Sequence, residues 1–334
     1  MADAEMIRTL YLGFLHRDPR PNELEHWEQR LAADLSAEGL ARALLDSEEF
    51  GAIRKKVRSL FVPPGHFYSP IVDVDQVRGR FGTMQPNIPP AAIRIDVDAI
   101  GRVWLELLPY LRDIPFPEEA DPAWRYHFKN PAFSYGDASI LHAMLRRFRP
   151  KRLVEVGSGY SSACSIDTID RYLDRAVDVS FVEPYPALLL KLLGEERVAR
   201  CTVHATGVQD TDPQVFTRLE AGDFLFIDST HVMKTGSDVC HELFNVLPAL
   251  KPGVFVHFHD IFWPFEYGPN WIIKENRSWN EIYGLRAFLM YNDAFEIVFF
   301  NDWFARNRRD LIENDYPEML KNTGGSIWLR KLRN

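Results

Sequence analysis

The sequence predicts an α/β fold, a doubly wound and mostly parallel sheet of seven strands, with a small all-helical domain before it. Apolar strand-like runs alternate with helical stretches from residue 152 onward, which is typical of a parallel sheet covered on both faces. The first run ends in a glycine-containing turn, and residues 4–58 show only helical periodicity. We therefore expect a helical N-terminal domain over 1–58, an irregular connector with a helix over 59–120, and the α/β domain over 121–334.

The N-terminal helices are indicated by the spacing of apolar residues. Ile7, Tyr11 and Phe14 recur at helical intervals, and a proline-containing break over 18–21 separates them from a second helix. Between 62 and 90, prolines and glycines are too frequent for long regular elements, so we expect a connector there. Two further helices are predicted, over 95–115 and 137–148.

The remaining elements follow in alternation. Strands are predicted over 152–156, 178–183, 199–204, 223–228 and 253–259, with helices over 160–173, 186–194 and 236–249. Two later strand-like runs, 295–300 and 326–330, have no clear crossover helix between them. We expect these two runs to close the sheet as an antiparallel pair.

Charge and cysteine content limit the functional classes. The 334 residues carry a formal net charge of -8, which argues against an extended nucleic-acid surface, because such surfaces need clustered lysine and arginine. Three widely spaced cysteines do not form a disulfide framework, as in proteins of a reducing compartment. No apolar run approaches the ~20 residues that span a bilayer, and the acidic start differs from a signal peptide. We expect a cytoplasmic protein with no nucleic-acid partner and no membrane span.

The turn after the first predicted strand points to a cofactor site. A dinucleotide fingerprint would place a third glycine where Ser162 stands and would have no use for the carboxylate of Glu155. A carboxylate there suits a ligand that carries an ammonium and a sulfonium group, which indicates S-adenosylmethionine. The residues expected to contact its methionine part are Glu155, Gly157, Ser158, Gly159, Tyr160, Ser161 and Ser162.

The ends of the next strands supply the other cofactor contacts, since ligands of doubly wound sheets bind outside the carboxyl ends of the strands. Glu183 lies 26 residues beyond Gly157 and is expected to accept hydrogen bonds from both ribose hydroxyls. Val208 is expected to pack on the adenine, and Gln209 or Asp210 to accept from its amino group. Asp228 completes the predicted cofactor set.

Asp228, His231, His259 and Asp260 follow the fourth and fifth predicted strands, and two schemes compete for them. In the first, Asp228 and Asp260, together with His231 or His259, hold a divalent metal ion, magnesium or a transition ion, which binds an acceptor hydroxyl and lowers its pKa. In the second, His231 or His259 takes the hydroxyl proton without a metal, beside Asp260. A purely structural role as strand-end hydrogen-bonding groups is the third interpretation.

Aromatic and polar loop residues are the candidates for contacts with a methyl acceptor. The segment 261–271 is too apolar for an ordinary surface turn, so it is expected to form a lid or to stack on a sugar or another flat acceptor, although core packing explains some of its rings equally well. The predicted acceptor contacts are Tyr68, Asn130, Tyr135, His257, Trp263 and Tyr267.

Several motifs carry a resemblance to a known family. They lie at residues 130–138, 155–162, 181–186, 226–239, 257–262 and 324–328. Over about 66–330 the chain resembles bacterial class I S-adenosylmethionine-dependent methyltransferases related to small-molecule and sugar O-methyltransferases. The resemblance implies a seven-stranded sheet with a reversed last strand, and a small-molecule or carbohydrate acceptor. Wider relatives bind magnesium through acids that correspond to Asp228 and Asp260, but this chain has Ile261 where they often have a third ligand.

The first fifty residues resemble a short helical domain of unknown function found in bacterial surface-polysaccharide and linker proteins. The motifs are residues 11–27 and 45–50. Partner docking or homo-oligomer formation through these helices, and simple packing as an extension of the main domain, are equally compatible with the pattern. For the whole chain we expect O-methylation by in-line methyl transfer. The alternatives are an inactive cofactor-binding scaffold that works through its N-terminal helices, and a nicotinamide oxidoreductase.

Overall fold

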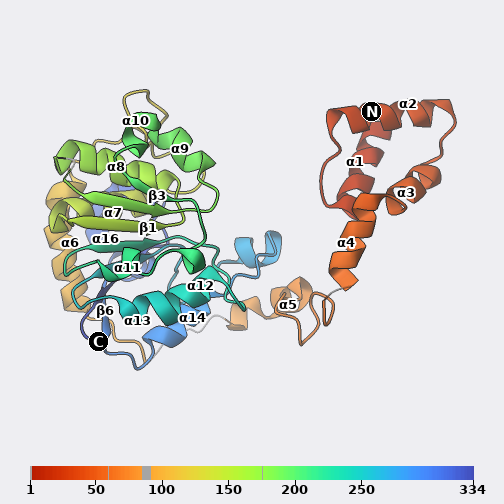
Figure 1. Cartoon of the computed structure of the whole chain (residues 1–334). Coiled ribbons are helices and arrows are strands. Elements are labelled where there is room, and N and C mark those ends of the chain that lie inside the picture. Colours follow the sequence, from red (N-terminus) through yellow and green to blue (C-terminus); the bar gives the residue numbers. More distant parts are fainter. Residues whose placement is uncertain (1, 59, 85–91, 175) are drawn as a thin grey trace. The chain divides into compact units, whose positions relative to one another are not determined.

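The computed structural model of the chain describes residues 2–58, 60–84, 92–174 and 176–334 (Figure 1). The chain divides into two compact units, Met1–Val77 and Arg78–Asn334. The first unit contains α1 (Ala2–Leu15), α2 (Pro21–Ala33), α3 (Ala37–Leu45) and α4 (Glu48–Arg58), so the helical N-terminal region is confirmed. Its apolar core is formed by Ile7, Tyr11, Leu15, Leu40 and Leu44.

Arg17 joins the helices of the first unit at their polar ends. Its Nη1 lies 2.8 Å from Glu23 at the start of α2, and its Nε lies 2.7 Å from Glu49 in α4. The proline-rich segment was predicted to lack long regular elements, and that prediction is wrong in part. The helix α5 (Val74–Met84) occupies its second half, because residues 74–81 contain no proline. Residues 85–91 of the predicted connector lie outside the described residues.

The second unit is built on a seven-stranded sheet with the order β3-β2-β1-β4-β5-β7-β6. The strands are β1 (Arg152–Val156), β2 (Asp178–Val182), β3 (Thr202–His204), β4 (Phe224–Ile227), β5 (Phe255–Phe258), β6 (Phe295–Phe300) and β7 (Ile327–Lys331). The first five strands pair in parallel, and β7 pairs antiparallel with both β5 and β6. The predicted fold, including its antiparallel closing pair, is confirmed. Every residue of β4 and β5 is buried, as expected for strands covered on both faces.

Helices cover both faces of the sheet. On one side α6 (Val97–Leu111), α7 (Tyr135–Phe148) and α8 (Tyr160–Tyr172) pack side by side, and α9 (Ala187–Leu193) packs on α8. In Figure 1, α12 (Asp238–His241), α13 (Leu247–Ala249) and α14 (Glu281–Leu289) lie on the other side of β1 from α8 and α9. The elements α10 (Glu195–Val198), η1 (Val208–Asp210), α11 (Gln214–Thr217) and η3 (Asn270–Lys274) lie in the connections.

Three predicted elements differ from the structure. β3 begins at Thr202 rather than at 199, because the turn after α10 occupies 199–201. The single helix predicted over 236–249 is interrupted by a π-helical turn, η2 (Glu242–Val246), ahead of Pro248. Between β6 and β7 lie two short helices, α15 (Asn301–Asn307) and α16 (Arg309–Asp315), followed by η4 (Pro317–Lys321).

Candidate functional site

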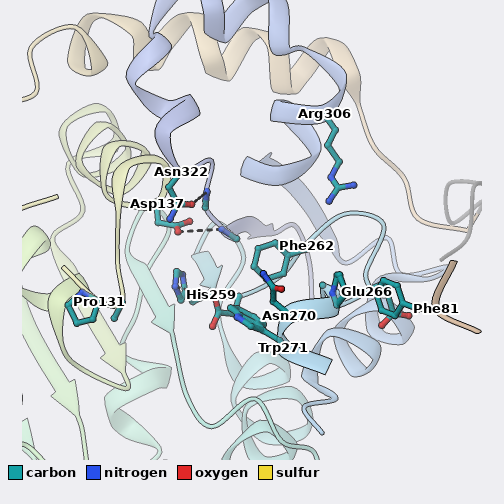
Figure 2. Close-up of a pocket in the computed structure, with 16 residues that line it drawn as sticks. Phe81, Pro131, Asp137, His259, Phe262, Glu266, Asn270, Trp271, Arg306 and Asn322 are labelled. Atoms are coloured by element: carbon teal, nitrogen blue, oxygen red, sulfur yellow. Dashed lines mark hydrogen bonds and ion pairs between the residues drawn. The ribbon is translucent and has the colours of Figure 1, made fainter. Parts of the chain in front are cut away.

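Two adjoining cavities open at the carboxyl ends of the parallel strands, where a doubly wound sheet binds its ligands. The β1 cavity, of about 300 Å³, is lined by residues 131–133 and 157–161 with Glu183, Leu188 and Asp228. The β5 cavity, of about 660 Å³, is lined by His259, Asp260, Phe262, Trp271 and other residues shown in Figure 2. Pro131 and Ala132 line both cavities, so the two spaces are neighbours.

The backbone conformation of the loop after β1 requires glycine at position 157. Gly157 has φ 76°, and a Cβ on it would lie 1.8 Å from the carbonyl oxygen of Asp228. Its backbone N–H donates to the carbonyl of Val182 at 3.0 Å, and the Asp228 N–H donates to the carbonyl of Val156 at 2.8 Å. Backbone hydrogen bonds therefore join the end of β1 and its loop to the ends of β2 and β4, the two strands beside β1.

Glu155 lies beneath this loop rather than on a cavity wall. Its side chain is fully buried, and its Oε1 accepts hydrogen bonds from the hydroxyls of Ser161 (2.6 Å) and Ser162 (2.9 Å) at the start of α8. Burial raises the pKa of the Glu155 carboxyl to about 8, and the neighbouring carboxylates of Asp228 and Glu183 act in the same direction. The geometry makes Glu155 a support for the start of α8, and its predicted direct contact with a ligand stays a prediction.

Glu183 follows β2 and lines the β1 cavity. Its Oε2 accepts from the backbone N–H of Ser158 at 3.0 Å, and its Oε1 accepts from the backbone N–H of Tyr185 at 2.7 Å. Each oxygen keeps a second lone pair, because a carboxylate offers about four acceptor sites. Glu183 is thus held in a fixed orientation at the cavity wall, and its ribose contact stays a prediction.

Val208 and Gln209, predicted to flank an adenine, lie in η1 and line neither cavity. Val208 is buried. The amide of Gln209 donates to the carbonyl of Gly236 at 2.9 Å, which joins η1 to the segment before α12.

His231 is buried and lines neither cavity, but it contacts a wall residue of each. Its Nε2 is 3.5 Å from Oδ1 of Asp228, which lines the β1 cavity, and 3.5 Å from Oδ2 of Asp260, which lines the β5 cavity. Both His231 (φ 61°) and Asp260 (φ 57°) adopt left-handed backbone conformations, which non-glycine residues rarely hold without supporting contacts. The sequence prediction that Asp228, His231 and Asp260 come together is consistent with these distances.

Glu281 completes this group and was not foreseen from the sequence. Its Oε2 lies 2.7 Å from Nδ1 of His231, and it is almost completely buried. Burial lowers the pKa of His231, but the bond and charge of Glu281, together with Asp228 and Asp260, outweigh it, so the pKa is raised. Glu281 is 50 residues from His231 in the chain, so no local spacing could have paired them.

His259 lines the β5 cavity, and its Nε2 lies 3.5 Å from Oδ1 of Asp260. Burial alone would lower its pKa, but the carboxyl groups of Asp228, Asp260 and Asp137 raise it to about 9. Its Nδ1 is buried and has no hydrogen-bond partner among the described residues. His259 therefore carries a positive charge near neutral pH and presents an N–H donor.

His257 belongs to the core. It is fully buried, its ring stacks on Phe226 at 3.8 Å between centroids, and it lies 4.8 Å from Trp328. Burial lowers its pKa well below the ordinary value, so the ring is neutral. His257 points to the same side of the sheet as His259, whose ring it stacks on at 5.9 Å, but it lines neither cavity.

Asn130 and Tyr135 shape the walls rather than face either cavity. Asn130 donates to the carbonyls of His127 and Phe133 and accepts from two backbone N–H groups, so it folds the loop that carries Pro131 and Ala132. Tyr135 stacks on Phe128 at 4.7 Å and donates to Glu118 at 3.1 Å.

The aromatic loop forms one wall of the β5 cavity, although the two residues predicted to touch the acceptor do not line it. Trp263 packs near Phe265 and Phe300, and Tyr267 is almost fully buried. Phe262 and Trp271 are the rings that face the cavity, in a perpendicular pair at 5.3 Å (Figure 2). Tyr68 lies in the first compact unit and is exposed.

Within the described ranges, no three histidine, cysteine, aspartate or glutamate side chains are arranged to hold a metal ion. Asp228, His259 and Asp260, the metal ligands predicted from the sequence, each line one of the two cavities, and both carboxylates lie 3.5 Å from a histidine nitrogen. A metal ion among them stays a prediction. None of the helices in the described residues combines the length and apolarity that crossing a bilayer requires.

Comparisons with known proteins agree with this architecture. Residues 154–261 match the model of a methyltransferase domain family, and residues 1–53 match a domain of unknown function, DUF4214. An uncharacterized protein from Archaeoglobus fulgidus is 30% identical over 177 residues, which cover 51% of this chain and 78% of that protein.

Solved structures with a similar fold include two methyltransferases. A Podospora anserina methyltransferase bound to S-adenosylhomocysteine aligns with a TM-score of 0.37 and 15% identity over 77% of this chain and 94% of that one. The O-methyltransferase TomG from Streptomyces achromogenes, in complex with S-adenosylmethionine, aligns with a TM-score of 0.35 and 12% identity over 78% of this chain and 96% of that one. By the methyltransferase domain family that residues 154–261 match and by the seven-stranded sheet with its reversed last strand, the chain belongs to the class I S-adenosylmethionine-dependent methyltransferases.

Proposed function

We propose that this protein transfers a methyl group from S-adenosylmethionine to a hydroxyl of a small-molecule or carbohydrate acceptor, with His231 as the general base. One observation carries the proposal. Nε2 of His231 lies 3.5 Å from a carboxyl oxygen on the wall of each cavity, Asp228 on one side and Asp260 on the other. A basic nitrogen thus lies where a cofactor in the β1 cavity and an acceptor in the β5 cavity would meet.

The β1 cavity has the features that S-adenosylmethionine requires. The loop 157–161 brings backbone close to the ligand space, and Glu183 and Asp228 supply negative charge on the wall. When bound, this cofactor supplies a methyl group on a positively charged sulfur. Glu183 would hold the ribose, and the loop would hold the methionine part.

The β5 cavity suits a flat, hydroxyl-bearing acceptor. Its volume of about 660 Å³ is in the range of cavities that bind small organic ligands. The rings of Phe262 and Trp271 offer stacking surfaces, while Asn270, Arg306 and Asp260 offer hydrogen-bonding groups around them (Figure 2). Trp263 and Tyr267 would act indirectly, by supporting the loop that excludes water from the site.

The two histidines have different roles in this proposal. Nε2 of His231 would accept the hydroxyl proton as the acceptor oxygen forms its bond to the methyl carbon. The bond between that carbon and sulfur would break in the same step, and S-adenosylhomocysteine would leave. His259, with its raised pKa and its place on the wall of the β5 cavity beside Asp260, would supply positive charge there and help to orient the acceptor. Because Nε2 of His231 lies 3.5 Å from each of the two carboxylates, where a proton acceptor would be held between them, we favour proton transfer over the metal scheme.

Titration calorimetry on the full chain tests the cofactor. S-adenosylmethionine and S-adenosylhomocysteine should bind and NAD should not, and magnesium chloride should leave both affinities unchanged. Transfer of a labelled methyl group is then measured with catechol, glucose and a nucleotide sugar as probe acceptors, with and without magnesium. His231→Gln should retain cofactor binding and lose transfer.

Three results would contradict the proposed function or change its mechanism. NAD binding in place of S-adenosylmethionine would contradict the proposal, and strict dependence of transfer on magnesium would restore the metal scheme. Cofactor binding without transfer to any probe, in wild type and variant alike, would favour the inactive scaffold.

A further inference from the structure

The segment 279–281 holds residue 231 through both its backbone and its ring. The N–H groups of Asn280 and Glu281 donate to the carbonyl of His231 at 3.0 and 3.1 Å. The Asn280 side chain bonds both the N–H and the carbonyl of Met233, and the Trp279 ring lies 4.4 Å from the imidazole of His231. These contacts fix the backbone of His231 in its left-handed conformation and limit rotation of its ring.

The same segment fixes which ring nitrogen meets Glu281. Oε2 of Glu281 lies 2.7 Å from Nδ1 of His231, the distance of a strong hydrogen bond. Glu281 is 1% exposed, so bulk water does not compete for this oxygen. Its other oxygen, Oε1, is buried without a hydrogen-bond partner among the described residues, so the pairing with His231 is the bond that this carboxyl makes.

On this geometry we propose that Glu281 is a positioning residue, which accepts the Nδ1 proton of His231 and so keeps Nε2 free to act as the base. The inference rests on the proposed function, because Glu281 has this role only if His231 is the base. In a neutral imidazole one nitrogen donates and the other accepts. A carboxylate on Nδ1 therefore selects the tautomer in which Nε2, between Asp228 and Asp260, carries the lone pair.

A merely structural role for Glu281 would predict something different. Any side chain of similar size could then satisfy the fold, and the tautomer of His231 would not depend on a carboxylate. Leucine at position 281 is similar in size but offers no acceptor to the Nδ1 proton, so the preference for this tautomer should be lost. Aspartate keeps the acceptor but is one methylene shorter, so it should restore the tautomer at least in part.

The experiment is nitrogen-15 NMR of the histidine rings in the full chain bound to S-adenosylhomocysteine, recorded at a pH where His231 is neutral. His231→Gln identifies the signal of His231 by its loss. Wild type should show a protonated Nδ1 and an unprotonated Nε2, Glu281→Leu should lose this tautomer, and Glu281→Asp should retain it. Glu242→Leu is the matched control, since it removes a buried carboxylate near Glu281 that does not contact the ring of His231.

A protonated Nε2 in the neutral wild-type ring would overturn the inference, as would an unchanged tautomer in a folded Glu281→Leu variant. If Glu281→Leu does not fold, the wild-type tautomer and the Glu281→Asp spectrum decide. Cofactor binding and methyl transfer are not read in these spectra, so failure of the proposed function is detected separately. Where a probe acceptor is methylated, Glu281→Leu should also lower kcat by ~100-fold or more with little change in the acceptor KM.

Discussion

At the scale of single residues, Glu183 tests the cofactor assignment most directly. We predict that Glu183→Ala weakens binding of S-adenosylmethionine by ~1 to 3 kcal/mol, because it removes an acceptor for the ribose and leaves the N–H of Ser158 without its partner. Titration calorimetry measures the loss. Glu183→Gln is the control, since its single carbonyl oxygen retains part of the bonding and should give an intermediate affinity. Wild-type affinity in Glu183→Ala would rule out the ribose contact.

The buried carboxyl of Glu155 should make the free energy of unfolding depend on pH. Its pKa is about 8 in the folded state and ~4.3 when exposed, so the folded state favours the protonated form. The contribution of protonated Glu155 to the free energy of unfolding is therefore fully present below pH ~4.3. It falls by roughly 3 to 6 kcal/mol as the pH rises to 8. Glu155→Gln cannot ionise and should lack this loss.

Urea unfolding of both proteins at pH 5 and pH 8 checks the prediction. The free energy of unfolding of Glu155→Gln should rise relative to wild type as the pH increases. Glu106→Gln, which changes an exposed glutamate in an ion pair with Arg147, should run parallel to wild type. Parallel curves for Glu155→Gln as well would show that Glu155 is ionised in the folded state.

The residue scale also shows where sequence reasoning stops. Asp228, His231 and Asp260 could be predicted to meet because they follow neighbouring parallel strands, whose carboxyl ends share one edge of the sheet. Glu281 lies in the first turn of α14, beyond the fifth strand, and no periodicity connects it to His231. His257 and His259 are both buried, but only His259, which directly follows β5, lines a cavity.

At the scale of elements, the turn between β1 and α8 depends on Gly157. We predict that Gly157→Ala lowers both the melting temperature and the affinity for S-adenosylmethionine, the latter by at least ~10-fold. A Cβ would meet the carbonyl oxygen of Asp228 at 1.8 Å, and the positive φ adds strain of ~1 to 3 kcal/mol. Scanning calorimetry and titration with the cofactor measure the two effects.

Gly101→Ala is the matched control for this substitution. Gly101 lies inside α6, where a Cβ would have its nearest neighbour 3.9 Å away. Alanine is the better helix former, so this variant should be as stable as wild type or slightly more stable. Equal melting temperatures for Gly157→Ala and Gly101→Ala would contradict the tight turn.

Elements were predicted well where local pattern determines them and poorly where tertiary contacts do. The bounds of β1 and β6 agree with the sequence, because each is a short apolar run flanked by clear breaks. The helix over 236–249 contains a π-helical turn at Glu242, whose carboxyl accepts from Ser229 at 3.1 Å, and no single-sequence pattern indicates that long-range bond. Helix α5 was missed because prolines on both sides of it dominated the local composition.

At the scale of the whole molecule, the question is whether the N-terminal helices contribute to the proposed cofactor site. Every residue on the walls of the β1 cavity, and His231 and Glu281 beside it, comes from 131–281, within the second unit. The first unit has an apolar core of its own, around Ile7 and Leu40. The β1 cavity, which we propose as the cofactor site, and the helical domain are thus built from separate parts of the chain.

We predict that a fragment of residues 78–334 folds and binds S-adenosylmethionine within ~2-fold of the full chain, because the contacts that shape the β1 cavity all lie inside it. Titration calorimetry compares the two proteins, and scanning calorimetry of the full chain should show a separate transition that the fragment lacks. Sedimentation of both proteins then tests whether the N-terminal helices form a homo-oligomer. A fragment that folds but does not bind the cofactor would mean that residues 1–77 complete the site, and the helical domain would then have to be included in any account of catalysis.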